Sequence, residues 1–127
     1  MDGALNGNYS PTIKIEMYGQ LSNQEQQAQL YEAIIDTGFT GAISIPLVKA
    51  LPMGLTLFST ASYTLADGSQ ASVFLCFGIV RLNGEERTLV FSLSQGNDIL
   101  LGTEFLAAFN AKLELNYRTE KFTLLTQ

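Results

Sequence analysis

Two dipeptides that favour tight β-hairpins place the strongest constraint on the fold of this chain. Asp67-Gly68 and Asn83-Gly84 each stand between apolar runs, and glycine accepts the positive φ that such turns need. Short runs that alternate between apolar and polar residues recur along the chain, for example in residues 12–18, "TIKIEMY". Such runs are typical of strands with one buried face. The sequence therefore predicts an all-β fold.

About nine short strands are expected from these runs. They are predicted at residues 12–18, 31–36, 41–46, 58–65, 69–82, 85–93, 97–102, 112–117 and 121–126. The polar stretch 20–30 predicts a turn or hairpin tip, and residues 46–55 predict a helical turn. The N-terminal residues around Asp2 are expected to be loose.

One short helix is predicted near the C-terminus, over residues 103–110, "TEFLAAFN". Thr103 is a suitable N-cap, and Phe105, Leu106 and Phe109 share one face of the helix. These three side chains are expected to belong to the hydrophobic core. No domain boundary is visible, so residues 1–127 are predicted to form a single domain.

Composition excludes several kinds of function. The net charge is −5 without a basic cluster, which argues against a nucleic-acid partner. The chain has no histidine and one cysteine, Cys76, so it contains neither a Ser-His or Cys-His nucleophile pair nor a His/Cys zinc site. We expect no metal and no cofactor. Cys76 lies in an apolar run and is predicted to be a small buried residue.

The sequence also carries no recognisable membrane or targeting signal. No apolar run approaches the ~20 residues of a membrane-spanning helix. The first residues, "MDGALNGNYSPT", lack the basic and apolar regions of a secretory signal. The expectation is a soluble, cytoplasmic protein without a membrane partner.

The segment "AIIDTGFTGAISIP", residues 33–46, contains an acidic residue where the pattern predicts a buried strand. A carboxylate at the end of a buried strand is costly unless it is hydrogen-bonded or used in chemistry. In Asp36-Thr37-Gly38 the threonine hydroxyl can brace the loop against neighbouring backbone, and Gly38 allows its amide to approach the carboxylate. Taken alone, this tripeptide is also common as a simple turn after a strand.

Its context makes the motif more specific. An apolar strand precedes Asp36, a strand and the Asp67-Gly68 hairpin follow it, and "DILLG" then leads into the helix at 103–110. This order resembles that of the retropepsin-like aspartic proteases, over residues 13–125, and "DTGFTG" is most similar to small bacterial members. The interval from Asp36 to Gly102, 102 − 36 = 66 residues, is also of the family's size. The resemblance implies one closed β-barrel or sandwich lobe with a short C-terminal helix.

The resemblance implies an aspartic endopeptidase, in which two carboxylates share one proton and activate a water that hydrolyses a peptide bond. Of the four aspartates, Asp2, Asp36, Asp67 and Asp98, only Asp36 lies in the motif. The second carboxylate must therefore come from another molecule, which predicts a homodimer with Asp36 on its two-fold axis. The expected partners are a second copy of the chain and a peptide or protein substrate.

Further roles follow from the resemblance alone. Thr37 would reach the opposite loop across the axis, and the N- and C-terminal strands, residues 10–15 or 121–127, would form an intermolecular sheet. The hairpin tip would act as a flap that closes over the substrate. The substrate-binding residues that the resemblance implies are Phe39, Thr40, Gly41, Ile43, Ala66, Asp67, Gly68 and Leu100.

The chain also departs from the viral members of this family. Phe39 stands where they carry a small residue, which changes the pocket shape and the electrostatics of the carboxylate pair. Thr103 replaces an arginine, and Gly41 replaces the acidic residue to which that arginine is tied. Both ends of that ion pair are therefore absent, and dimerisation must be supported in another way.

Two alternatives to the protease remain at this stage. One is a catalytically inactive, dimeric relative that binds extended peptides or builds an assembly. The other is an unrelated small β-barrel that carries a lipid or another small ligand.

Overall fold

The computed structural model describes residues 2–20 and 29–126, so the turn predicted at 20–30 lies mostly outside the described residues. The strands are β1 (Asp2–Leu5), β2 (Pro11–Gly19), β3 (Gln29–Ile35), β4 (Ile43–Pro46), β5 (Thr56–Thr64), β6 (Gln70–Leu82), β7 (Glu85–Ser94), β8 (Ile99–Leu101), β9 (Ala111–Asn116) and β10 (Lys121–Thr126). The helices are α2 (Leu47–Ala50), the 3₁₀ helix η1 (Leu51–Met53) and α3 (Thr103–Ala108). The predicted all-β class is confirmed, and α2 with η1 supplies the helical turn predicted at 46–55.

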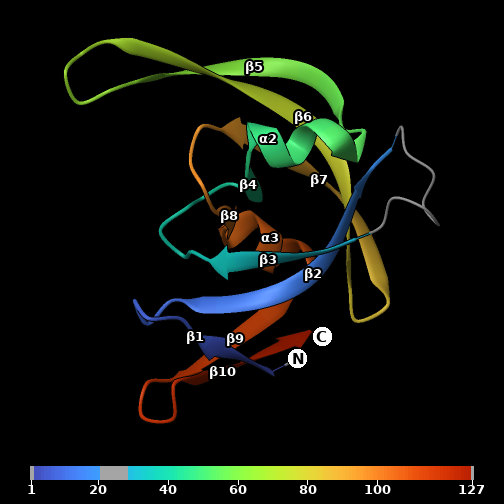
Figure 1. The fold of residues 1–127 in the computed structure, drawn as a ribbon, viewed down its shortest axis with the longest axis vertical. Coiled ribbons are helices and arrows are strands. Elements are labelled where there is room, and N and C mark those ends of the chain that lie inside the picture. Colours follow the sequence, from blue (N-terminus) through green and yellow to red (C-terminus); the bar gives the residue numbers. More distant parts are fainter. Residues whose placement is uncertain (1, 21–28, 127) are drawn as a thin grey trace.

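Six of the strands form a closed barrel (Figure 1). In the order β6-β7-β4-β8-β3-β2 each strand pairs with the next, and pairing between β2 and β6 closes the ring. Strands β3 and β8 are parallel to each other, as are β4 and β7. The predicted hairpin at Asn83-Gly84 joins β6 to β7, and both residues have positive φ.

The hydrophobic core fills the barrel as the alternating pattern predicts. Ile13, Ile15 and Met17 of β2 are all buried. Phe105 of α3 and Phe109, the residue that caps its C-terminus, are fully buried, and their ring centroids are 5.2 Å apart. Cys76 is buried and unpaired, as expected. Helix α3 therefore belongs to the core, directly after the buried strand β8.

Three strands form an extension outside the ring, in the order β1-β10-β9. The expectation of a loose N-terminus is wrong, because β1 pairs with both β10 and β2. The Thr123 hydroxyl also donates a hydrogen bond of 3.0 Å to Asp2 Oδ1. The four residues of β1 have no apolar alternation of their own, so their order depends on partners that include β10 from the other end of the chain.

The start of α3 also differs from the prediction. The N-cap is Gly102, and Thr103 is the first helical residue. The Thr103 hydroxyl does not cap the helix, because it donates to the carbonyl of Thr40 at 3.2 Å. The helix ends at Ala108, two residues earlier than predicted, and Asn110 follows with a positive φ of 49°.

In residues 2–20 and 29–126, none of the helices has the length and apolar character needed to cross a membrane.

Candidate active site

The end of strand β3 fixes the position of Asp36. Ala33 and Ile35 are buried in the barrel, and β3 runs parallel to β8 up to the pair Ile35 and Leu101. The Asp36 amide then donates to the Leu101 carbonyl at 2.9 Å, which continues this pairing by one residue. Asp36 is half-buried, whereas Thr37 and Gly38 are exposed. The backbone of Asp36 is therefore held by the barrel while the next two residues face outward.

Hydrogen bonds within the loop orient the Asp36 carboxylate. The Gly38 amide donates to Asp36 Oδ1 at 2.9 Å, and the Phe39 amide donates to the Asp36 carbonyl at 3.1 Å. A Cβ on residue 38 would lie 3.2 Å from Asp36 Oδ1, so glycine permits this close approach. The predicted approach of the Gly38 amide is confirmed. In the described part of the chain the Thr37 hydroxyl has no hydrogen-bond partner, so the predicted bracing of neighbouring backbone does not occur within one subunit.

The turn between β8 and α3 holds the other side of the loop. The Thr103 amide donates to the Phe39 carbonyl at 2.9 Å, and the Glu104 amide donates to the Gly41 carbonyl at 3.2 Å. With the Thr103 hydroxyl on Thr40, three successive loop carbonyls are bound by two residues of α3. These hydrogen bonds connect the helix to the loop at the place where the family resemblance implies an ion pair.

The same hydrogen bonds determine which backbone groups of the loop stay available. Among the described residues, the amides of Thr40 and Gly41 and the carbonyl of Gly38 have no hydrogen-bond partner. These groups can accept an extended peptide as a neighbouring strand. Of the backbone expected to contact a substrate at residues 39–41, only the amides of Thr40 and Gly41 are therefore available, because the Phe39 amide and all three carbonyls already form hydrogen bonds.

A cavity of about 390 Å³, called here the Asp36 cavity, opens beside the carboxylate. Leu100 lines it, together with Asp36 and Thr37. Its remaining walls are Tyr9, Ser10, Pro11, Ile34, Ile35, Leu113, Leu115 and Tyr117. The residues from the turn before β2 and from β9 were not candidates from the sequence. They lie far from the Asp36 motif along the chain, and no sequence pattern around them indicates a functional site.

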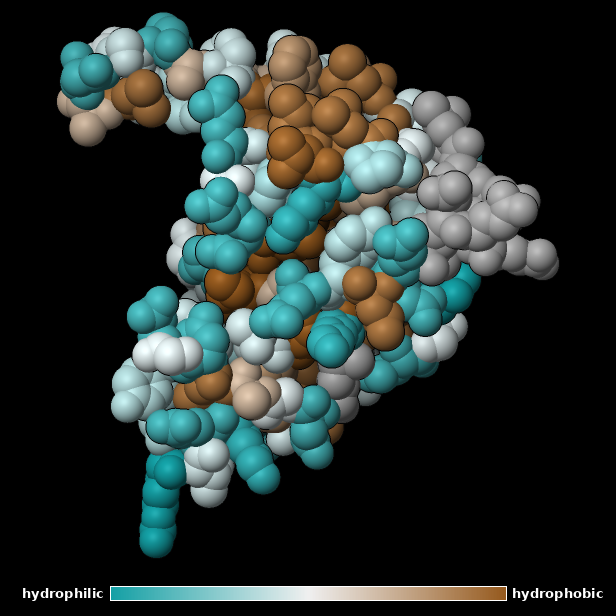
Figure 2. Space-filling view, viewed as in Figure 1, coloured by the Kyte–Doolittle hydropathy of each residue, from teal (hydrophilic) through white to brown (hydrophobic). Residues whose placement is uncertain are grey.

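A second cavity, of about 480 Å³, lies between Phe39 and the outer half of the β5–β6 hairpin, close to its tip. Phe39, Tyr63 and Val73 line it, and the rest of its wall is formed by Ser44, Ala71, Ser72, Ser92, Leu93, Ser94 and Gln95. Figure 2 shows the hollow below the projecting hairpin at the upper left. Phe39 thus lines a cavity, and its contact with a substrate stays a prediction.

Ile43 does not have the expected position. Its side chain is 0% exposed and belongs to the core, so it cannot contact a substrate directly. The prediction that Ile43 lines a side-chain pocket is therefore wrong. The neighbouring Ser44 points to the opposite face of β4 and lines the cavity under the hairpin instead.

The tip of the β5–β6 hairpin is a compact turn that contains Ala66, Asp67 and Gly68, and the predicted hairpin is confirmed. The Ser69 hydroxyl and amide donate to Asp67 Oδ1 at 2.6 and 2.9 Å. These hydrogen bonds, the one from the hydroxyl first, hold the pKa of Asp67 below its usual value. The tip projects away from the barrel (Figure 1), and its three candidate residues line neither of the two cavities.

We expect Asp67→Ala to loosen the tip without unfolding the barrel. The pKa of Asp67 is lower in the folded protein than in the unfolded chain. The ionised carboxylate therefore stabilises the folded tip at pH above the unfolded pKa of about 3.9, and this stabilisation is lost as the pH falls through the folded pKa. Hydrogen exchange at the Ser69 amide should be several-fold faster in the variant at neutral pH. Asp98→Ala, at another exposed aspartate, should leave this exchange unchanged. Equal exchange in wild type and Asp67→Ala would contradict the expectation.

Comparisons with known proteins identify the fold. No family model matches the chain, and no curated protein matches it. Among solved structures, the EIAV protease complexed with the inhibitor HBY-793 superposes with a TM-score of 0.61 at 14% identity, over 87% of this chain and 97% of that one. The protease of simian foamy virus (mac), determined in solution, gives 0.55 at 14% identity, over 79% and 98%. The chain thus has the retropepsin-like aspartic protease fold, as predicted.

Proposed function

We propose that this chain is an aspartic endopeptidase that acts as a homodimer. The observation that carries the proposal is the setting of Asp36: a carboxylate at the end of a buried strand, hydrogen-bonded by the Gly38 amide, faces a cavity in a retropepsin-like fold. A carboxylate in a cleft that is held by specific donors is typical of a catalytic group. The fold adds support, because both similar structures are named as proteases.

In the proposed mechanism, the two Asp36 carboxylates of a dimer hold one proton between them, because like charges at close range are not both ionised. The ionised carboxylate removes a proton from a water as its oxygen attacks the carbonyl carbon of the peptide. The protonated carboxyl donates its proton to the carbonyl oxygen. The resulting tetrahedral species then breaks at the C–N bond as a proton passes to the leaving nitrogen.

A second copy is required because one chain brings only one acid to the site. Among the described residues that form the wall of the Asp36 cavity, Asp36 is the one acidic residue. Asp67 lies in the hairpin tip, and Asp98 lies in the exposed turn before β8. The unpartnered Thr37 hydroxyl is exposed beside Asp36 and is available to bind the opposite loop.

The substrate is expected to bind as an extended strand. The amides of Thr40 and Gly41 and the carbonyl of Gly38 would hydrogen-bond its backbone, and the β5–β6 hairpin would cover it from above. Phe39 and Tyr63 would contact its side chains in the cavity beneath the hairpin. Exclusion of water by the closed hairpin would strengthen the interactions at the two carboxylates.

The experiment that tests this function is cleavage of a diverse peptide library by the wild-type chain at several pH values, with products identified by mass spectrometry. Cleavage at defined bonds, insensitive to metal chelators, would support the endopeptidase. Peptides that bind but are never cleaved, at any pH, would instead favour the inactive peptide-binding relative.

The pH dependence provides a prediction of its own. Because the pair must retain one proton, activity should be highest below neutral pH and should fall as the second carboxyl loses its proton. A pH–rate profile of kcat/KM on a cleaved peptide measures this. A rate that continues to rise from acid through neutral to alkaline pH would contradict the shared-proton mechanism.

A further inference from the structure

The cavity of about 480 Å³ next to Phe39, called here the hairpin cavity, has two walls of different chemistry. One wall is the outer surface of the barrel at β4 and β7, and the other is the side of the β5–β6 hairpin that faces the barrel. Because a substrate side chain would lie between these walls, their chemistry decides which side chains the hairpin cavity accommodates.

The barrel wall carries a row of hydroxyl groups. Ser44 of β4 is paired with Ser92 of β7, and Ser94 follows two residues later, so the three side chains share one face. Ile43 and Phe91, which alternate with them, are buried in the core. The three serines therefore point outward, into the hairpin cavity.

These hydroxyls can form further hydrogen bonds. The Ser92 hydroxyl donates to the Ile43 carbonyl at 3.2 Å, and its oxygen can still accept. In the part of the chain that the structure describes, the hydroxyls of Ser44 and Ser94 have no partner. Gln95 adds an exposed amide to the same wall. The barrel wall thus offers both donors and acceptors to a side chain that enters the cavity.

The hairpin wall is mostly apolar. Tyr63 pairs with Ala71 across the hairpin, and Val73 follows on the same face of β6. Phe39 adds its ring, which packs closely against the loop, since a Cβ on residue 41 would lie 2.6 Å from Cζ of Phe39. A side chain between the two walls therefore has apolar contacts on one side and hydroxyl groups on the other.

The hairpin cavity has no counter-ion for a charged side chain. Among the described residues that line it, none is Asp, Glu, Lys or Arg. An ionised substrate side chain would lose contacts with water here without gaining an opposite charge. An aliphatic side chain would cover the Ser44 and Ser94 hydroxyls and leave them without partners. An uncharged side chain with an amide or hydroxyl group avoids both costs.

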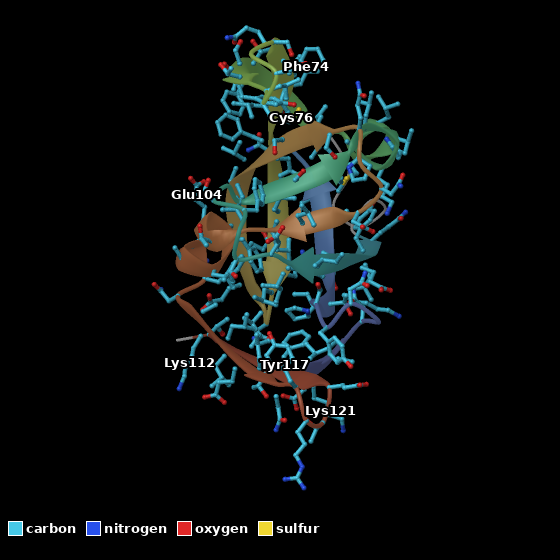
Figure 3. All side chains as sticks on the ribbon, turned by 90° about the vertical axis from the view of Figure 1, so that its left-hand side faces the viewer. Phe74, Cys76, Glu104, Lys112, Tyr117 and Lys121 are labelled. Atoms are coloured by element: carbon cyan, nitrogen blue, oxygen red, sulfur yellow. The ribbon has the colours of Figure 1, made fainter. Side chains whose placement is uncertain are left out.

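The hairpin cavity also lies beside the backbone groups that remain available to a peptide. The amides of Thr40 and Gly41 directly follow Phe39, which lines the cavity. Figure 3, viewed from the side toward which the hairpin projects, shows Phe74 of the hairpin at the top and Tyr117 of the Asp36 cavity near the bottom. A peptide strand that runs past the Asp36 loop can therefore direct one of its side chains toward the hairpin.

We propose that the hairpin cavity is a specificity subsite that selects an uncharged polar side chain of the substrate, namely asparagine, glutamine, serine or threonine. Ser44 and Ser94 determine this selection: they hydrogen-bond the amide or hydroxyl group, while its methylene groups contact Tyr63 and Val73. This inference rests on the proposed function and adds to it the class of side chain that the substrate carries.

Peptides that differ at one position test this selection. In a peptide that the wild-type chain cleaves, each position near the cleaved bond is replaced in turn by glutamine, leucine, lysine and glutamate. At one position, kcat/KM for glutamine should exceed that for the other three by about tenfold or more, because each of them leaves hydroxyls or a charge unpaired. The absence of any position with this preference would overturn the proposal.

Variants of the serine row test which residues are responsible. The double variant Ser44→Val/Ser94→Val should reverse the preference at that same position, so that leucine is cleaved faster than glutamine. Ser44→Thr/Ser94→Thr keeps both hydroxyls and should retain the preference for glutamine. Ser62→Val is the matched control, since Ser62 is exposed on the same hairpin and lines neither cavity. A folded valine variant that still prefers glutamine would overturn the assignment, and if that variant does not fold, the wild-type peptide series alone decides.

Binding measurements separate a failure of this inference from a failure of the proposed function. Peptides that bind with the same preference for glutamine, measured by fluorescence anisotropy, but are never cleaved would support the subsite and reject the endopeptidase. Cleavage without a preference for uncharged polar side chains would reject only the subsite. A chain that neither binds nor cleaves any peptide would reject both.

Discussion

Asp36→Asn should reduce peptide cleavage by about 10⁴-fold or more, because it removes both the general base and the general acid from a dimer that uses the same residue twice. Asparagine keeps the size of the side chain, and its Oδ1 can still accept the Gly38 amide. The fold should therefore be retained. Initial rates on a cleaved peptide, with circular dichroism and sedimentation on the same samples, measure both effects.

The matched control for this variant is Asp98→Asn, the same chemical change at an exposed residue outside both cavities. It should keep wild-type activity. A mixing experiment adds a second readout: an excess of Asp36→Asn should inhibit the wild-type chain, because subunit exchange leaves dimers with one carboxylate. Full activity in Asp36→Asn, or no inhibition on mixing, would reject the shared site.

The second large effect is expected for Gly102→Ala. A Cβ at this position would overlap the carbonyl of Gly41 and lie 2.5 Å from the carbonyl oxygen of Phe39. These carbonyls are the acceptors for the Thr103 and Glu104 amides, so the loop must move away from α3. Overpacking of this kind destabilises a fold by about 1–3 kcal/mol. A displacement of about 1 Å at the loop would cost roughly 100-fold in activity.

Gly96→Ala provides the control, because a Cβ there would lie 3.7 Å from its nearest neighbour, an ordinary contact. Thermal unfolding and kcat on the cleaved peptide measure the two effects separately. If Gly102→Ala retained wild-type stability and activity, the close packing of the β8–α3 turn against the Asp36 loop would not matter for the site.

The loop contacts also explain how the site tolerates its departures from the viral sequences. With Thr103 and Gly41 in place of a charged pair, an ion pair between helix and loop cannot form. The backbone of the β8–α3 turn and the Thr103 hydroxyl bind the three successive carbonyls instead. Hydrogen bonds to backbone carbonyls need no charged side chain in the loop, so this support does not require the absent ion pair.

Local patterns in the sequence determined most of the strands, both glycine hairpins and the position of Asp36 at a strand end. Each of these depends on neighbouring residues: side chains alternate along a strand, and glycine relieves the strain of a tight turn. The same reasoning failed for β1, for the N-cap of α3 and for Ile43. In those places the outcome was set by partners distant in sequence, namely β10, Thr40 and the barrel core.

Only the tertiary structure decided what surrounds Asp36. Segments far apart in the sequence meet where β2 pairs with β6 and where Tyr9 and Tyr117 line the Asp36 cavity. The position of β9 at the edge of the sheet likewise depends on the whole strand order. No pattern of neighbouring residues predicts these arrangements. The packing of α3 likewise decided which carbonyls of the Asp36 loop form hydrogen bonds, and so which backbone groups of the loop remain available. The sequence by itself determined that an acid would stand at the end of a buried strand, because hydrophobic alternation is local. The choice of neighbours for that acid depends on long-range pairing, which a one-dimensional pattern does not contain.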